Sequence, residues 1–411
     1  MRQQLQLIFP ALAIFLAFVL VSNCGPANSQ STTPPQSLSA DPPQLSKTNL
    51  MMGLSQPWDL AFVPNGDLLF TERCIGLSVR KTDGQTVRLF GPAGAILAAP
   101  DMFCEGQSGA HGIAIDPDFQ SNRMIYLFMA SNISNPRTNR VVRLTVNSDY
   151  SVVNNRVDII TDIPFKHQSN SHGGIGAHSG GRLRFGPDGY LYVTTGDNHN
   201  GPLPQDLQRL GGKVLRVDRN GQAAAGNNTP FGGDARIFTY GHRNVQGICF
   251  HPDTGQAYTA EHGPNHSDEV TLISAGGNAG WDPKPDAGVN CADNYCGYGS
   301  NNTAGTPTSM TDLNKFPNAM KPVLSMNDSQ GMGPCGFLVG SQWKSWDRAL
   351  VVGIMGGARL EVLQVANENL IEQMTAGQLP AARLRSTVQG PDGNLYIATD
   401  AGEIWVVTPA P

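Results

Sequence analysis

The sequence has few charged residues and no excess of positive charge. Charged residues make up 15% of its 411 residues, and 28 Lys and Arg stand against 33 Asp and Glu, which gives a net charge of −5. Proteins that bind nucleic acids or anionic membrane surfaces rely on clustered Lys and Arg. The composition therefore argues against both kinds of partner.

The chain also lacks sustained helical periodicity after its N-terminal segment, and it contains no Cys-x-x-Cys pair. Helices would repeat apolar residues at helical spacing, and a thiolate zinc site normally contains closely spaced cysteines. Glycine and proline, by contrast, are abundant, with 47 and 29 residues. Short strands joined by tight turns use both residues, so the sequence favours an all-β fold.

The N-terminal residues have the pattern of a targeting segment. The start MRQQ precedes the apolar run LIFPALAIFLAFVLVS, which is short for a membrane span. Cys24 directly after it resembles the lipid-bearing cysteine of a bacterial lipoprotein, and ordinary cleavage after ANS is the alternative. We expect residues 1–24 to be a signal peptide or lipoprotein signal, and the polar residues 25–47 to be a disordered tether. Either signal predicts an exported protein, periplasmic or lipid-anchored in the cell envelope.

Six cysteines remain once Cys24 is set aside, and export to an oxidising compartment makes disulfides the default. Six cysteines can pair in many ways. Cys291 and Cys296 flank the four residues ADNY and are expected to form a local pair. By elimination, the remaining pairs would be Cys74–Cys104 and Cys249–Cys335.

One pattern recurs along the chain: an alternating apolar strand, a Pro-Asx turn and a second alternating strand. The copies are WDLAFVPNGDLLFTER, GIAIDPDFQSNRMIYLFMA, GRLRFGPDGYLYVTTGD, GICFHPDTGQAYTAEHG and RSTVQGPDGNLYIATDAG, with a degenerate copy in GFLVGSQWKSWDRALVVGIMG. Proline presets the backbone for such turns, and alternation on both sides indicates hairpins. The repeats predict a six-bladed β-propeller over residues 48–411, each hairpin forming the inner pair of a four-stranded blade. A β-sandwich or several small β domains are the alternatives.

A propeller brings the loops that follow its inner hairpins together at the mouth of the central channel. Polar clusters stand at that place in several repeats, namely Glu72-Arg73, Asp197-Asn198-His199, Glu261–Pro264 and Asp400. These clusters are far apart in the sequence, yet the predicted fold would make them face one another.

The loop AEHGPNHSDEV places several potential ligands in one short turn, namely His262, His266, Asp268 and Glu269, together with a Gly263-Pro264 pair. A cation site is one interpretation, because calcium takes six to eight oxygen ligands that include backbone carbonyls. An ordinary polar turn is the other.

Two stretches, YGHRNVQGICFHP and AEHGPNHSDEVTLISAGGNAGWDP, resemble the soluble quinoprotein glucose/sorbosone (aldose sugar) dehydrogenase family. GQSGAHGIAIDPDF, HSGGRLRFGPDGYLYVTTGD and ARLRSTVQGPDGNLYIATD match further motifs of this family in the same order. The resemblance covers nearly all of the chain after about residue 50. It implies a calcium-assisted propeller that uses pyrroloquinoline quinone (PQQ). Such an enzyme oxidises an aldose at C1 to the lactone by hydride transfer to PQQ, and it passes the electrons to an acceptor that the sequence does not identify.

The resemblance also implies roles for particular residues. His178 matches the catalytic base, which also contacts the cofactor, and Asp197 matches the carboxylate that orients the base. Arg243 matches a residue that contacts the quinone edge and stabilises developing oxyanion charge. Without the resemblance, His178 would be an ordinary histidine in a loop rich in Gly, Ser and His.

Further positions match the family's cofactor and metal contacts. Asn244 matches a residue that contacts the quinone edge, and Gln107 matches another polar contact. Arg383 and Arg385 match residues that contact the carboxylates of PQQ, because arginine binds a carboxylate bidentately. Residues i and i+2 lie on one face of an extended strand, so both arginines are expected to point the same way. The Gly263-Pro264 turn would hold calcium through backbone carbonyls, while Asp268 and Glu269 would shape the loop or supply negative potential.

The sequence departs from the family pattern at two places. Ala177 occupies the position that usually holds an acidic or amide residue before the base. A lysine of the glucose dehydrogenase branch falls by register near Gly356, where the sequence has no lysine, and Arg359 is the candidate substitute. These departures favour the broader aldose dehydrogenase branch. Two other functions stay open: a calcium-dependent propeller lactonase or hydrolase, and a non-catalytic exported binding propeller.

Overall fold

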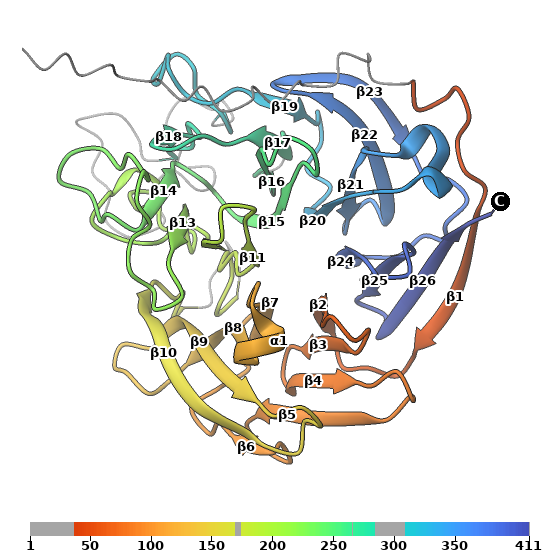
Figure 1. Ribbon diagram of the computed structural model, residues 1–411. Coiled ribbons are helices and arrows are strands. Elements are labelled where there is room, and N and C mark those ends of the chain that lie inside the picture. The colour runs from red at the N-terminus through yellow and green to blue at the C-terminus, as the bar shows by residue number, and fades with distance from the viewer. Residues whose placement is uncertain (1–36, 169–173, 265, 284–308, 411) are drawn as a thin grey trace, which may run out of the picture. The chain divides into compact units, whose positions relative to one another are not determined.

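The protein folds as a ring of six β-sheets around a central axis (Figure 1). The computed structural model describes residues 37–168, 174–264, 266–283 and 309–410. The sheets follow one another in chain order, and the first strand of each lies at the centre of the ring. The all-β, six-bladed propeller expected from the repeats is confirmed.

The first three blades lie between residues 57 and 240. The first contains β2 (Pro57–Phe62), β3 (Leu68–Glu72), β4 (Gly76–Arg80) and β5 (Thr86–Gly91), with β6 (Leu97–Ala98) parallel to β5. The second contains β7 (Ala110–Ile115), β8 (Met124–Ser131), β9 (Thr138–Val146) and β10 (Val153–Ile163), with the short helix α1 (Phe119–Asn122) between β7 and β8. The third contains β11 (Leu183–Phe185), β12 (Leu191–Thr194), β13 (Lys213–Val217) and β14 (Ile237–Tyr240), with β18 (Gly277–Asn278) parallel to β14 and the 3-10 helix η1 (Leu203–Gln205) before β13.

The other three blades complete the ring. The fourth contains β15 (Val245–Phe250), β16 (Ala257–Glu261), β17 (Glu269–Leu272) and β19 (Pro322–Ser325). The fifth contains β20 (Met332–Phe337), β21 (Leu350–Ile354), β22 (Arg359–Ala366) and β23 (Asn369–Thr375), with the 3-10 helix η2 (Ser341–Trp346) between β20 and β21. The sixth contains β24 (Leu384–Gln389), β25 (Leu395–Thr399), β26 (Glu403–Pro409) and the N-terminal β1 (Leu45–Met51).

The Pro-Asx turns join the two inner strands of a blade, as the repeats predict. In the third blade, Gly189 has a φ of 77° and donates its N–H to the Gly186 carbonyl over 2.9 Å. The Asp188 side chain accepts the N–H of Tyr190, the residue that leads into β12. Proline and aspartate stand in the middle of this turn and glycine takes its left-handed position, which glycine adopts without steric cost. The turn chemistry therefore fixes the register of the hairpin.

The apolar core lies between the blades. Each pair of neighbouring blades shares one cluster of buried side chains; for example, Leu77 and Phe90 of the first blade pack with Ile113 and Leu127 of the second. Equivalent clusters join the second to the third blade, and so on around the ring to the sixth and first. Burial of apolar surface is the main favourable term in folding, so contact between blades stabilises the ring and leaves its axis available for polar groups.

The N-terminal strand β1 closes the ring. It pairs antiparallel with β26 and so becomes the outer strand of the sixth blade. Just before it, Leu38 is fully buried beside Trp343 and Trp346. The Glu372 carboxylate accepts the backbone N–H groups of Leu38, over 2.7 Å, and Ser39.

The folded unit therefore begins earlier than the boundary expected at residue 48, which falls inside β1. The residues expected to form a tether, 25–47, overlap the described fold from residue 37 onward. Their polar composition hid this, because a single buried leucine and backbone pairing along one edge strand leave little apolar pattern in a sequence. The targeting segment and Cys24 lie outside the described residues and stay predictions. Within the described residues, no helix has the length and apolar character needed to cross a membrane.

Two disulfides link neighbouring blades. Cys74, which follows β3, pairs with Cys104, which precedes β7, and Cys249 of β15 pairs with Cys335 of β20. Both pairs are those expected by elimination. The expected pair Cys291–Cys296 lies outside the described residues, as does most of the long insertion around it.

We expect Leu38→Ala to destabilise the protein by about 2–5 kcal/mol, the usual cost of emptying a buried leucine site. The control is Met52→Ala, only a few residues along the chain, because Met52 is 67% exposed and such a change normally stays within about 0.5 kcal/mol. Urea unfolding measures both. Equal stability of the two variants would show that residues before β1 do not belong to the folded unit.

Candidate active site

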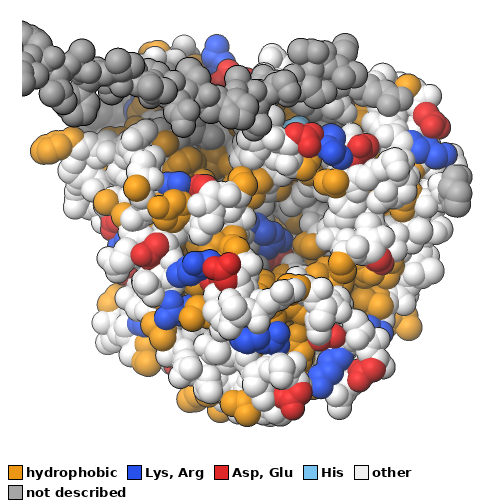
Figure 2. All heavy atoms as spheres, in the orientation of Figure 1, with side chains coloured by type: hydrophobic (Ala, Val, Ile, Leu, Met, Phe, Trp, Pro, Cys, Tyr) orange, Lys and Arg blue, Asp and Glu red, His pale blue; other side chains and the backbone are white. Residues whose placement is uncertain are grey.

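One face of the ring gathers the polar clusters that the repeats predict. In every blade the second inner strand ends on the face where the first begins, because the two strands are antiparallel. Glu72 ends β3, Asp197 follows β12, Glu261 ends β16 and Asp400 follows β25. Figure 2 shows that the ring is hollowed at its centre and that Lys or Arg side chains lie within the hollow.

His178 and Asp197 form a hydrogen-bonded pair on this face. The Nδ1 atom of His178 lies 2.8 Å from the Oδ1 atom of Asp197, which is fully buried. The other carboxylate oxygen of Asp197 accepts the indole N–H of Trp281 over 2.8 Å. Because a carboxylate only accepts hydrogen bonds, the proton lies on Nδ1 of His178, and the lone pair of the neutral ring lies on Nε2. This is the tautomer that a general base needs.

The surroundings keep His178 neutral at physiological pH. Its side chain is 10% exposed, and burial, followed by the positive charge of Arg243, holds the pKa of the imidazole well below its usual value. The backbone also constrains the residue, because His178 has a φ of 52°. A Cβ at Gly196 would lie 2.1 Å from the His178 carbonyl oxygen, so only glycine permits the close approach of the segment that carries Asp197.

Two further basic side chains lie beside His178. The ring of His199 lies against that of His178, with 3.6 Å between the ring centroids. The Nζ atom of Lys166 lies 3.2 Å from Nδ1 of His199, and burial lowers the pKa of Lys166 to about 8. Sequence reasoning missed Lys166 and Trp281, because residues distant in the sequence give no signal that they meet the same pair.

Glu261 organises the segment that contains Arg243 and Asn244. Its carboxylate accepts the backbone N–H groups of both residues and contacts Nδ1 of His242. The Arg243 guanidinium donates to the His262 carbonyl over 2.9 Å. The Asn244 side-chain oxygen accepts the N–H of Gly180, two residues after His178. The fold thus brings the expected quinone-edge residues next to the expected base.

Asp268 holds the Gly263-Pro264 turn from within. Its carboxylate is completely buried and accepts four hydrogen bonds, one from the hydroxyl of Ser329 and the others from the backbone N–H groups of Gly263, Gln330 and Met332. A carboxylate engaged in this way shapes the loop, as the sequence predicts, and has little capacity left for a metal ion. Gly263 is required here because a Cβ would lie 2.0 Å from the His266 carbonyl oxygen.

Glu269 does not supply negative potential at neutral pH. Its side chain is buried, and burial raises its pKa to about 8. The Glu269 carboxyl group is therefore mostly protonated at neutral pH, and its oxygen accepts the hydroxyl of Thr311. No group of three or more His, Cys, Asp or Glu side chains in the described ranges is arranged to hold a metal ion.

A cavity of about 270 Å³ opens beside these groups. Its walls are mostly polar and include Gln107 and Arg385, two of the expected cofactor contacts, together with Ser179 and Gly180 next to His178. Arg383 and Arg385 point the same way, as their spacing predicts, and both bind the carboxylate of Asp400. Arg383 is not among the cavity walls, and its side chain is 53% exposed.

Arg359, the candidate substitute for the family lysine near Gly356, lies at the start of β22. Its guanidinium contacts the carboxylate of Glu361 and the side-chain oxygen of Gln330. Glu361 is buried and also accepts the hydroxyl of Thr375. The charge of Arg359 is therefore compensated inside the fifth blade.

Comparisons with known proteins agree with this geometry. The family model for Glucose / Sorbosone dehydrogenase matches residues 54–406. Aldose sugar dehydrogenase YliI of Escherichia coli is 29% identical over 363 residues, which cover 87% of this chain and 91% of that protein. Quinoprotein glucose dehydrogenase B of Acinetobacter calcoaceticus is 29% identical over 278 residues, which cover 61% of this chain and 55% of that protein.

Solved structures give the same result. The soluble aldose sugar dehydrogenase of Escherichia coli in its apo-form has a TM-score of 0.72 and 26% identity, covering 89% of this chain and all of that one (100%). The PQQ-bound form of the aldose sugar dehydrogenase of Streptomyces coelicolor has a TM-score of 0.67 and 25% identity, covering 90% and 99%. The resemblance seen in the sequence motifs is confirmed. The chain belongs to the glucose/sorbosone dehydrogenase family and is a sugar dehydrogenase.

Proposed function

We propose that the protein is a PQQ- and calcium-dependent dehydrogenase that oxidises an aldose at C1 to the lactone. The observation that carries the proposal is the buried His178–Asp197 pair beside a cavity whose walls contain arginine and amide side chains. The names of its relatives, a quinoprotein and a PQQ-bound aldose sugar dehydrogenase, support PQQ as the cofactor. The electron acceptor is a further partner whose identity the described residues do not indicate.

The chain's part in the reaction is to remove a proton and to stabilise charge. In the tautomer set by Asp197, Nε2 of His178 takes the proton of the C1 hydroxyl while the C1 hydrogen leaves with its electron pair. Asp197 then stabilises the imidazolium that forms, and Trp281 and the backbone N–H of His199 hold Asp197 in place. Bound PQQ would supply the acceptor for the electron pair, and Arg243 would stabilise the negative charge that develops on the quinone oxygen.

The cavity residues fit a planar polycarboxylate. Arg385 of the sixth blade and Gln107, on the loop between the first and second blades, both present hydrogen-bond donors to the cavity. The cavity wall carries the Arg385 guanidinium and the side-chain amides of Gln56, Gln107 and Gln246. Guanidinium and amide groups are donors that carboxylates accept, so this lining fits a ligand with several carboxylates. We propose Gln107, Arg243, Asn244, Arg383 and Arg385, with His178, as the PQQ contacts.

We propose that calcium binds through the carbonyl oxygens of Gly263 and Pro264. Because Asp268 is engaged within the loop, main-chain oxygens are the donors that this turn can offer. Calcium accepts such ligands and completes its shell with ligand and water oxygens. A lactonase with calcium held by several carboxylates would need a cluster that the described ranges do not contain.

Export is part of the proposal. The apolar N-terminal segment supports it, and the two inter-blade disulfides fit an oxidising compartment. Whether Cys24 carries a lipid is decided by mass spectrometry of the mature protein.

We expect His178→Ala to lower the turnover of aldose by about 10²–10⁴-fold, the usual contribution of a general base, while PQQ binding to the apo-protein changes little. The matched control is His251→Asn, in a turn between β15 and β16, where the side chain caps backbone N–H groups. Dye-linked steady-state rates and a PQQ titration measure the two effects. Turnover within about twofold of the wild type would remove His178 from the base position.

The activity should persist on the acidic side of neutrality. A histidine with the usual pKa of about 6.5 would be only about one quarter neutral at pH 6. Because the pKa of His178 lies well below that value, the base stays neutral, and kcat/KM at pH 6 should remain within about twofold of its value at pH 8. A pH profile with a dye acceptor that does not titrate in this range tests this. An acid limb centred near 6.5 would contradict a neutral buried base.

Two substitutions separate loop shape from metal ligation. Asp268→Asn places an amide against backbone donors, so it should destabilise the apo-protein by about 1–3 kcal/mol and also weaken calcium-dependent PQQ binding. Pro264→Gly gives the unfolded chain and the free turn more conformational entropy, so it should lower apo stability by only about 0.4–1 kcal/mol and weaken calcium binding by a few-fold. Urea unfolding and calcium titration at fixed PQQ measure both. If Asp268→Asn lowers calcium affinity without changing apo stability, Asp268 is a ligand and the carbonyl site is wrong.

A further inference from the structure

Arg73 lines the cavity and forms no ion pair with a carboxylate of the described residues. The residue follows β3 in the first blade and was expected only as part of a polar cluster. Its Nε atom donates to the side-chain oxygen of Gln56 over 2.8 Å, and its Nη1 atom donates to the Gly106 carbonyl over 2.5 Å. No Asp or Glu oxygen of the described residues lies within ion-pair distance of this guanidinium.

The charges around Arg73 increase the need for an anion. The charged side chains of the cavity wall are Arg73, Arg385 and Asp400. Asp400 is already bound by Arg385 and by Arg383. His111 adds no charge, because burial lowers its pKa to about 3. Burial and then the repulsion of Arg385 lower the pKa of Arg73 itself, while the charge of Asp400 acts in the opposite direction. The cavity wall thus holds a partly buried cation that an anionic ligand would stabilise.

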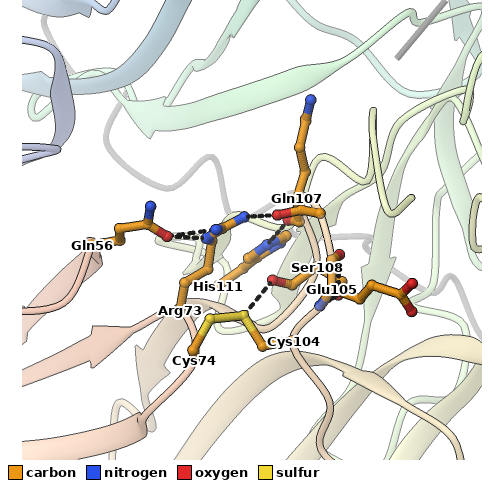
Figure 3. The surroundings of a disulfide bond; sticks show 9 residues. Gln56, Arg73, Cys74, Cys104, Glu105, Gln107, Ser108 and His111 are labelled. Atoms are coloured by element: carbon orange, nitrogen blue, oxygen red, sulfur yellow. Dashed lines mark hydrogen bonds between the residues drawn. A yellow bond between two sulfur atoms is a disulfide. The ribbon is translucent and has the colours of Figure 1, made fainter. Parts of the chain in front are cut away.

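Figure 3 shows Arg73 beside the Cys74–Cys104 disulfide, and contacts of its backbone also hold it in this place. The Arg73 carbonyl accepts the N–H of Ala110, which begins β7 of the next blade. A Cβ at Gly109 would lie 2.1 Å from that carbonyl oxygen, so the two segments are in close contact. The adjacent Cys74 is joined to Cys104 on the loop that carries Gly106 and Gln107. A cation held in advance loses little conformational freedom on binding.

We propose that Arg73, together with Arg385, binds a carboxylate of the molecule that occupies the cavity. The guanidinium matches a carboxylate with two parallel hydrogen bonds, and its present partners, an amide and a carbonyl, are neutral. This inference rests on the proposed function for its setting. It adds an anion contact from the first blade. The family motifs in the sequence do not indicate this position as a ligand contact.

The carboxylate can come from two sources. One is a carboxylate of PQQ, and the other is a carboxylate of a sugar acid such as a uronate that enters as substrate. If the cofactor supplies it, Arg73 acts on PQQ affinity for every sugar. If the substrate supplies it, Arg73 selects uronates over neutral aldoses and leaves PQQ affinity unchanged.

The test compares the wild type with Arg73→Gln, Arg73→Lys and the control Arg88→Gln. Arg88 lies on β5, its side chain is exposed, and its guanidinium donates to the Ala93 carbonyl. Tryptophan fluorescence follows PQQ titrated into apo-protein with calcium, and steady-state kinetics give kcat/KM for glucuronate and for glucose. Calorimetry with benzene-1,3,5-tricarboxylate, a planar tricarboxylate that needs neither calcium nor turnover, probes the anion site alone. Melting temperatures confirm that each variant is folded.

The expected result is a loss of roughly tenfold or more for Arg73→Gln, the scale of one charge-assisted hydrogen bond. The lysine variant should recover part of the affinity, because it keeps the charge without the planar fork. A loss in PQQ affinity assigns the carboxylate to the cofactor, and a loss confined to glucuronate assigns it to the substrate.

Other outcomes separate the two hypotheses. If the wild type neither binds PQQ nor oxidises sugars, yet benzene-1,3,5-tricarboxylate binds in an Arg73-dependent way, the proposed function fails and the anion site stands. The inference is overturned if Arg73 binds no carboxylate. In that case the affinities for PQQ and benzene-1,3,5-tricarboxylate and the kcat/KM for glucuronate are the same in the wild type, Arg73→Gln and Arg88→Gln.

Discussion

Apolar packing between neighbouring blades is the constraint on which the rest of this structure depends. Each cluster joins two blades, and the last joins the sixth blade to the first. A ring built in this way tolerates a polar centre, because its stability comes from the faces of the blades and not from a core on the axis. Closure adds the pairing of β1 with β26 and the burial of Leu38. The same closure places Arg385 of the sixth blade at the cavity that Gln107, on the loop before β7, also lines.

The site follows a division between groups that act and groups that hold. In the proposed site, His178, Arg243 and the arginines of the cavity wall would present donors or lone pairs to a ligand. Buried carboxylates hold their backbones: Glu261 accepts the N–H groups of Arg243 and Asn244, and Asp268 accepts those of the Gly263 loop. A buried carboxylate is stable where several hydrogen bonds replace its hydration. Asp268 therefore organises the Gly263-Pro264 turn, and under the proposed function the oxygens left for a metal ion would belong to the main chain.

Under the proposed function, sugar oxidation requires two opposite environments in one site. A neutral histidine must be kept unprotonated, which burial and the charge of Arg243 accomplish. A cofactor with several carboxylates must be neutralised, which calls for cations. The ring satisfies both because different blades contribute to different sides of the cavity. The third blade supplies His178 and Asp197, while the first and sixth supply Arg73 and Arg385.

The sequence by itself determined the blades, since alternating apolar residues and Pro-Asx turns act over a few neighbouring residues. Motif resemblance also placed His178, Arg243 and the Gly263-Pro264 turn among the candidates for one site. Only the tertiary structure decided which groups meet: Trp281 with Asp197, Asp400 with the arginine pair, and Leu38 with the tryptophans of the fifth blade. The tertiary structure also decides which side chains are charged and which of them have a counterion. Whether Glu269 is ionised or Arg73 has a counterion depends on burial and on neighbours from other blades, and no local pattern in a sequence encodes those distances.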